Sequence, residues 1–145
     1  MANLTDVKTG KLHAVYPQLY GNAYNEKEMD QRMIHLLLEH DRLFGEKNAS
    51  LFSTAGRSEL GGNHTDHNLG RVLAATINLD TIAAASRSDD GKVVLASEGF
   101  PVVKVDISDL SVHSDENNTT DSLVRGIAEA FQERGIAVGG WKANT

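Results

Sequence analysis

Apolar residues recur at helical spacing between Glu26 and Glu46. On a helix with 3.6 residues per turn, these positions and one histidine fall within an arc of about 100°; they are Met29, Met33, Leu36, Leu37, His40 and Phe44. The pattern predicts one amphipathic helix that stops near Gly45. We expect His40 to be a packed, hydrogen-bonded histidine rather than a ligand. Residues 9–26 are mixed and rich in turn formers, and they predict no defined element.

The spacing changes to alternation after residue 70. Residues 72–85 form a long apolar run in which one face carries Leu73, Ala75, Ile77 and Leu79. Asn78 and Asp80 point to the other face, and the alternation slips by one near Thr81, which predicts a bulged or bent strand. Residues 89–91, Asp-Asp-Gly, predict a hairpin turn into a strand at 92–96, and residues 102–107 alternate as another strand.

A second helix is predicted after a polar surface loop at residues 108–118. Thr120 or Asp121 is its expected N-cap, it runs to about Arg134, and Gly135 stops it. Its apolar stripe consists of Leu123, Val124, Ile127, Ala130 and Phe131. Gly126 costs a helix interior about 1 kcal/mol relative to alanine, which suggests close backbone packing there. Residues 139–145 resemble the start of one more strand.

These elements predict an α+β fold with a mainly antiparallel sheet and flanking helices. The chain has 145 residues, enough for one domain that buries about two thirds of its unfolded surface. Three strands in succession favour antiparallel pairing.

Charge and composition narrow the function. The net charge is -6 at pH 7, so the surface offers no electrostatic footprint for nucleic acid or an anionic membrane. The chain has no cysteine, which excludes disulfides and thiolate zinc sites. No signal peptide opens the sequence and no apolar run approaches the ~20 residues that a bilayer requires, so we expect a cytoplasmic protein. The oligomeric state is not predicted.

The densest polar chemistry lies at residues 56–70, which read Gly-Arg-Ser-Glu-Leu-Gly-Gly-Asn-His-Thr-Asp-His-Asn-Leu-Gly. We expect this glycine-rich connection to be a loop that forms a small-molecule site. The two carboxylate oxygens of Asp66 can accept hydrogen bonds from adjacent sugar hydroxyls, and His64 can bond to another. Arg57 is the only cation at the entry to this stretch, and its guanidinium suits a phosphate or a neighbouring base.

This stretch resembles the sugar-binding signature of galactokinases, Gly-Arg-Val-Asn-Leu-Ile-Gly-Glu-His-Thr-Asp-Tyr-Asn. The order of the following strands and of the helix that contains Leu123 to Ile127 is also similar to that family. Galactokinases are GHMP kinases, so the resemblance implies a GHMP-kinase N-terminal domain with the ribosomal protein S5 domain 2-like fold, here incomplete.

The resemblance also implies roles for four residues. Arg57 would stand beside the catalytic aspartate and the C1 hydroxyl, which makes it the catalytic candidate within this chain. His64 and Asn63 would face the C6 hydroxyl, and Asp66 would take the C3 and C4 hydroxyls. Asn63 replaces the glutamate of the family. Glu59 and His67 stand where the family has asparagine and tyrosine, and we give neither a catalytic role.

The family's phosphate loop, Gly-Leu-Ser-Ser-Ser-Ala, and the aspartate that follows it do not occur in the sequence. We therefore expect residues 1–145 to be the N-terminal, sugar-binding part of a longer kinase, without its phosphate loop and C-terminal domain. The resemblance implies ATP and Mg²⁺ as cofactors of the complete enzyme and galactose or a related hexose as its substrate. No cofactor-binding residue is assigned within the chain, and we expect the isolated chain to be inactive.

Other interpretations of the stretch stay open. It can be a polar surface loop whose glycines only form turns, or a zinc or iron site at His64, Asp66 and His67. The protein can also be a galactokinase-like relative that binds sugar without phosphorylating it. The departures at Asn63 and His67 leave open a kinase for a related sugar such as N-acetylgalactosamine.

Overall fold

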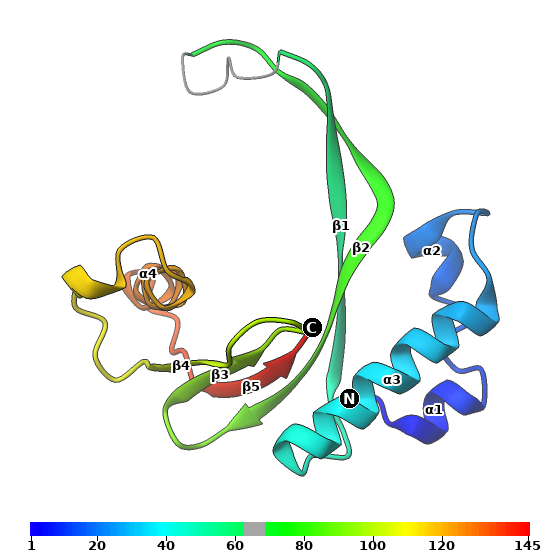
Figure 1. Ribbon diagram of the computed structural model, residues 1–145, viewed down its shortest axis with the longest axis horizontal. Coiled ribbons are helices and arrows are strands. Elements are labelled where there is room, and N and C mark those ends of the chain that lie inside the picture. The colour runs from blue at the N-terminus through cyan, green and yellow to red at the C-terminus, as the bar shows by residue number, and fades with distance from the viewer. Residues whose placement is uncertain (63–68) are drawn as a thin grey trace.

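The computed structural model describes residues 1–62 and 69–145. The helical elements are α1 (Leu4–Lys8), α2 (Tyr16–Tyr20), α3 (Glu26–Phe44), the 3-10 turn η2 (Ser114–Glu116) and α4 (Thr120–Glu133). The strands are β1 (Ser50–Gly61), β2 (Leu73–Ser88), β3 (Lys92–Ala96), β4 (Val103–Asp106) and β5 (Gly140–Asn144). Helices α1, α2 and α3 lie together beside the base of β1 and β2, and α4 lies at the other end of the sheet (Figure 1). The fold is α+β, as the sequence predicts.

The sheet has the strand order β1-β2-β5-β3-β4. All neighbouring strands are antiparallel except β3 and β5, which are parallel, so the predicted mainly antiparallel sheet is confirmed. The predicted hairpin at residues 89–91 is wrong, because β5 lies between the two strands that this turn joins. Gly140 pairs with Ser88 on one side, and the next residue, Trp141, pairs with Val93 on the other.

Helix α3 confirms the longest predicted helix. The side chain of Asn25 accepts hydrogen bonds from the backbone N–H groups of Lys27 and Glu28, and Gly45 ends the helix with a left-handed φ of 71°. His40 is fully buried, as expected for a packed histidine. Its Nδ1 lies 2.7 Å from Oδ1 of Asn144 and its Nε2 lies 3.0 Å from Oγ of Ser86. Helix α3 is thereby joined to β5 and to β2.

The two short helices before α3 were not predicted. Helix α1 begins with a capping box, in which Asn3 and Asp6 each bond to the other's backbone N–H. Val7 of α1 is fully buried and belongs to a core that also contains residues of α3, of β2 and of the segment before β1, namely Met33, Leu36, Leu37, Ala84 and Ala49.

A carboxylate joins α3 to the segment that contains α2. Asp30 of α3 lies 2.9 Å from Nε2 of His13 and accepts a bond of 2.8 Å from the hydroxyl of Tyr16. The bond to Asp30 raises the pKa of His13 above its usual value.

Helix α4 is confirmed with two corrections. Its cap is Thr119 rather than Thr120 or Asp121, and its backbone at Gly126 is not closely packed, because a Cβ there would meet no heavy atom within 4 Å. Arg125 and Ala128 are its buried residues. The central positions of its apolar stripe are exposed instead, with exposed fractions of 62% for Leu123, 51% for Ile127 and 46% for Phe131.

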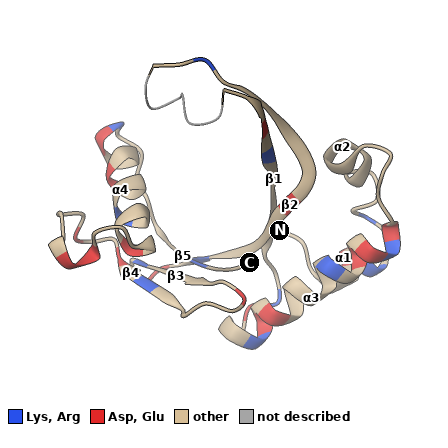
Figure 2. Ribbon diagram, turned by 45° about the horizontal axis from the view of Figure 1, so that its top comes forward, with Lys and Arg blue, Asp and Glu red and all other residues tan. Residues whose placement is uncertain are grey.

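Charged residues gather on the helices and on the loop after β4, whereas the outer parts of β1 and β2 carry few of them (Figure 2). In the part of the chain that is described, no helix has the length and apolar character needed to span a bilayer.

Candidate functional site

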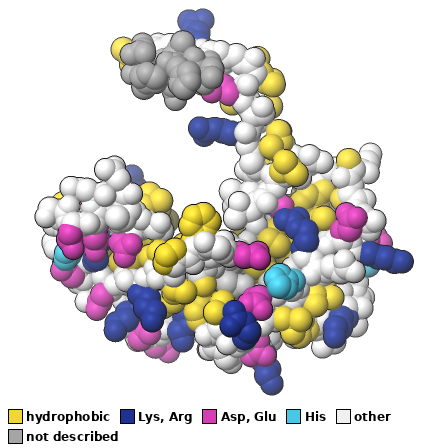
Figure 3. Space-filling model, viewed as in Figure 1, with side chains coloured by type: hydrophobic (Ala, Val, Ile, Leu, Met, Phe, Trp, Pro, Cys, Tyr) yellow, Lys and Arg dark blue, Asp and Glu magenta, His cyan; other side chains and the backbone are white. Residues whose placement is uncertain are grey.

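Strands β1 and β2 continue beyond the sheet as a two-stranded ribbon. Pairing in the outer part runs from Arg57 opposite Thr76 to Gly61 opposite Leu73. In the space-filling view the ribbon stands clear of the rest of the protein, with an open concavity between it and the side of the molecule where α4 lies (Figure 3). Residues 57–61 and 73–79 are exposed. This ribbon carries the first half of the polar stretch noted in the sequence.

Arg57 lies within strand β1, and not in a loop as we expected. It is exposed, and it follows a shift in register between the Ala55–Asp80 pair and the Arg57–Thr76 pair. Residues 77–79 of β2 lie opposite the single residue Gly56 of β1, so the irregularity predicted near Thr81 is present slightly earlier in the strand.

Close packing against β2 explains why glycine occupies position 56, directly before Arg57. A Cβ on Gly56 would lie 3.1 Å from the carbonyl oxygen of Leu79 and 3.3 Å from Cγ1 of Ile77. The absent side chain lets the irregular segment of β2 approach β1 closely, immediately before the residue that carries the guanidinium.

Gly62 follows the last residue of β1 and is the last described residue before position 63. Its φ is +86°, and a Cβ there would clash with the backbone of Arg71 and lie 2.9 Å from Cα of Val72. The next three candidate residues, Asn63, His64 and Asp66, fall at positions 63–68 and so lie outside the described residues. Their convergence with Arg57 stays a prediction, as does the alternative metal site.

The best-connected polar group at the root of the ribbon is Asp80 of β2. Its carboxylate accepts bonds of 2.6 Å from Tyr20 and 2.6 Å from Ser53, and one of 2.8 Å from Nη2 of Arg32. Burial acts to raise the pKa of Asp80, but these donors together outweigh it and hold the pKa below its usual value. From the sequence, Asp80 was predicted only to lie on the face opposite the apolar residues, and its bonding role was missed. A carboxylate inside a long apolar strand was the signal that could have indicated this role.

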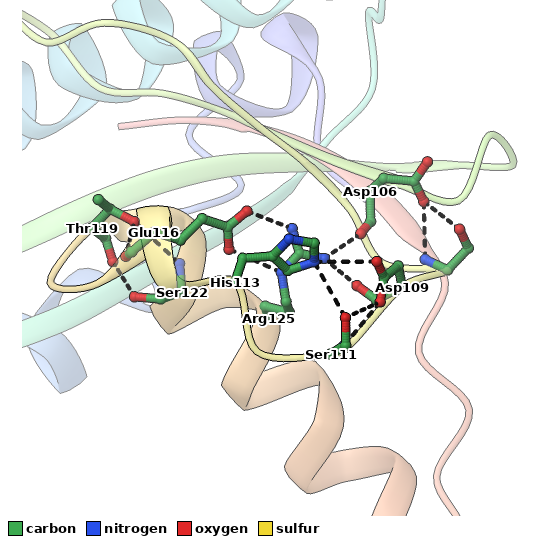
Figure 4. Close-up of polar contacts among 9 residues, drawn as sticks. Asp106, Asp109, Ser111, His113, Glu116, Thr119, Ser122 and Arg125 are labelled. Carbon is green, nitrogen blue, oxygen red and sulfur yellow. Dashed lines mark hydrogen bonds and ion pairs between the residues drawn. The ribbon is translucent and has the colours of Figure 1, made fainter.

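A second arginine, Arg125, forms hydrogen bonds that stabilise the fold. Arg125 of α4 forms a bidentate pair with Glu116, at 3.0 Å from Nε to Oε2 and 2.7 Å from Nη2 to Oε1 (Figure 4). Its Nη1 also donates to the carbonyl oxygens of Asp106 and Asp109. The bond from Arg125 lowers the pKa of Glu116. Arg125 therefore fastens α4 to the end of β4 and to η2, and its donors are directed into the fold rather than toward a ligand.

A cavity of about 710 Å³ lies between α3 and the segment that connects β3 to β4. It includes groups of both charge signs, among them Arg32, Arg42, Glu39 and Glu98. Within residues 1–62 and 69–145, no cluster of three or more His, Cys, Asp or Glu side chains could hold a metal ion.

Comparison with known proteins assigns the ribbon to a family. Residues 38–87, which span the end of α3 together with β1 and β2, match the family model of the galactokinase galactose-binding signature. The fold superposes on the structure of Lactococcus lactis galactokinase complexed with galactose with a TM-score of 0.66 and 29% identity, covering 78% of this chain and 30% of that one. These matches show that the chain is similar to the N-terminal region of galactokinases.

Galactokinase relatives agree over the same region. The galactokinase of Enterococcus faecalis is 36% identical over 75 residues, covering 52% of this chain and 19% of the relative. That of Clostridium perfringens strain 13 is 35% identical over 98 residues, covering 66% of this chain and 25% of the relative. The chain thus spans about a quarter of the length of these galactokinases and matches their N-terminal region.

The fold extends to other GHMP kinases. Mevalonate kinase from Methanococcus jannaschii superposes with a TM-score of 0.52 at 13% identity, covering 67% of this chain and 32% of that one. At this identity the likeness concerns the fold alone, and it confirms the predicted GHMP-kinase architecture.

Proposed function

We propose that residues 1–145 form the sugar-binding part of an ATP-dependent galactokinase that phosphorylates the C1 hydroxyl of galactose. The observation that carries this proposal is the match of residues 38–87 to the galactose-binding signature. The matched residues include the β1–β2 ribbon, whose exposed outer half adjoins the open concavity (Figure 3).

In this proposal Arg57 acts beside the C1 hydroxyl. Its guanidinium is permanently charged, and an extended strand holds its backbone, so it can stabilise negative charge that develops on a transferred phosphoryl group. His64 and Asp66 would bind sugar hydroxyls through charge-assisted and neutral hydrogen bonds, and Asn63 would offer an amide to the C6 hydroxyl.

ATP and Mg²⁺ belong to the reaction of a full-length galactokinase, in which they supply the phosphoryl group and neutralise its charge. In this proposal both groups belong to the full-length enzyme, and no residue of the chain is assigned to either of them. Cytoplasmic localisation is part of the same proposal.

The test is a galactose titration of the 145-residue chain followed by NMR or calorimetry, with Arg57→Ala and Asp66→Ala as variants. Galactose should bind, Arg57→Ala should weaken binding by about tenfold or more, and Asp66→Ala should abolish it, because bonds to charged groups contribute about 1.5–3 kcal/mol. Arg87→Ala is the matched control, since Arg87 is another exposed arginine on the paired strands. Retained binding in Asp66→Ala would contradict the assigned hydroxyl contacts.

Two further experiments test which sugar the chain binds and whether the chain alone phosphorylates it. Titrations with N-acetylgalactosamine and glucose test whether Asn63, in place of the family's glutamate, goes with a related hexose. Incubation with galactose, ATP and Mg²⁺ tests the expectation that the isolated chain does not phosphorylate sugar. Turnover by these 145 residues alone would show that the phosphate-binding residues lie within them.

A further inference from the structure

The root of the β1–β2 ribbon contains a buried carboxylate with three partners. The side chain of Asp80 is 5% exposed and that of its ion-pair partner Arg32 is 36% exposed. Tyr20 donates from α2, Arg32 from α3 and Ser53 from β1, whereas Asp80 itself belongs to β2. One side chain therefore fixes the two strands of the ribbon to each other and to two helices.

The position of Asp80 along the ribbon gives this contact a further consequence. Asp80 pairs with Ala55, and the next pair toward the outer end is Arg57 with Thr76, after the shift in register. The direction in which β1 leaves the sheet, and with it the place of Arg57, is thus set where the carboxylate holds the ribbon. A two-stranded ribbon has little stability of its own, so its orientation depends on such contacts at its root.

The charge of Asp80 suits this task better than a neutral side chain would. Bonds from a hydroxyl or a guanidinium to a carboxylate are roughly twice as strong as neutral bonds. If the acceptor is lost, two hydroxyls and a guanidinium are left without it in a partly buried place, where unpaired polar groups are costly.

We propose that Asp80 is a positioning residue for Arg57, which holds the root of the ribbon in the orientation that places the guanidinium at the sugar site. The proposal rests on the proposed function for its last step, the sugar site. It does not need that function for its first step, the control of Arg57 by Asp80.

The experiment compares Asp80→Asn with Glu116→Gln in the full 145-residue chain. The control removes the charge from another partly buried carboxylate–arginine pair, whose side chains are 19% and 10% exposed, on the far side of the sheet. NMR follows the Nε–H resonance of Arg57 and the amide exchange of residues 54–58 and 120–133. Galactose affinity is measured at a temperature where every variant is folded.

Asp80→Asn should shift the Arg57 resonance and speed exchange at residues 54–58 by about tenfold, with less than about twofold change at 120–133. Galactose affinity should fall by about tenfold while the variant stays folded. Glu116→Gln should leave the Arg57 resonance, exchange at 54–58 and the affinity unchanged. The double variant Ser53→Asp, Asp80→Ser exchanges the two side chains and so moves the carboxylate from β2 to β1. Recovery of the Arg57 resonance and of the galactose affinity in this variant would support a role of the carboxylate itself.

An unchanged Arg57 resonance together with unchanged exchange at residues 54–58 would overturn the proposal. So would an acceleration of equal size throughout the chain, which is the result expected of a merely structural residue. If Asp80→Asn does not fold, Tyr20→Phe and Ser53→Ala replace it, because each removes one hydrogen-bond donor to Asp80. The same measurements of the Arg57 resonance and of amide exchange then test the proposal. If the unmodified chain binds no galactose, the proposed function fails, while the Arg57 readout still decides on Asp80.

Discussion

Replacing Gly140 by alanine tests the central position of β5 in the sheet. A Cβ at this position would lie 2.8 Å from the carbonyl oxygen of Lys92, 2.9 Å from its nitrogen and 2.9 Å from the carbonyl oxygen of Ser88. All three atoms belong to the backbone of the flanking strands, so no side-chain rotation can relieve the contacts. Strands β2 and β3 would have to move apart at the point where β5 enters between them.

Overpacking of this kind costs about 1–3 kcal/mol, and we expect the upper part of this range, about 2–3 kcal/mol, because only backbone can move. For a chain of this size each kcal/mol lowers the melting temperature by about 2–4 °C, so the expected drop is about 5–10 °C. The reduced entropy of the unfolded alanine variant offsets less than about 1 kcal/mol of the loss.

Thermal unfolding followed by circular dichroism measures the effect. Gly139→Ala is the matched control, since a Cβ on this neighbouring, exposed glycine would meet no heavy atom within 4 Å. The control should change the unfolding free energy by no more than about 0.5 kcal/mol. Equal melting temperatures for the two variants would refute the argument that β5 is enclosed by β2 and β3 at Gly140.

Two other predictions concern the ribbon and the helices. Gly62→Ala should weaken galactose binding with little loss of global stability, because alanine is strained at a φ of +86° and its Cβ would lie 2.9 Å from Cα of Val72. A galactose titration checks this, with Gly61→Ala as the control, since a Cβ on Gly61 would meet no heavy atom within 4 Å. The bond to Asp30 raises the pKa of His13 above 6.5, so its stabilisation is complete below about pH 6.5 and is lost as the pH rises through the folded-state pKa. Urea unfolding at about pH 5.5 and pH 8.5 should show this loss in the unmodified chain but not in His13→Gln, and an unchanged pH dependence in the variant would exclude His13 as its source.

The sequence predicted best where a pattern was long. Helix α3 has a periodic apolar face and Gly45 as a left-handed stop, and both signals are local. Helices α1 and α2 have five residues each, too few for a periodic pattern to stand out. For α1, the capping pair Asn3 and Asp6 was a usable signal.

The neighbours in the sheet could not be predicted from local pattern. Residues 89–91 have the composition of a hairpin turn, but the strands that they join are separated by β5, which comes much later in the chain. Whether β2 and β3 pair directly or have β5 between them depends on contacts that are distant in sequence. Here the small size of Gly140 makes the insertion of β5 possible.

For the site, the family resemblance identified the region and the structure changed its local form. Arg57 was expected in a loop, because glycines on both sides of it suggest turns. The structure extends β1 through it, and Gly56 serves close packing against β2 instead. Asp80 was not recognised as a contact point because its three donors come from elements far apart in the sequence.

The insertion of β5 also governs the order in which this part of the protein can assemble during synthesis. A ribosome delivers β1, β2, β3 and β4 first, yet the sheet remains two separate antiparallel pairs until residues 140–144 emerge and bridge them. Between the synthesis of β4 and that of β5, the nascent chain thus exposes two inner strand edges. Such edges attract foreign strands, so shielding by a chaperone matters most just before β5 is synthesised.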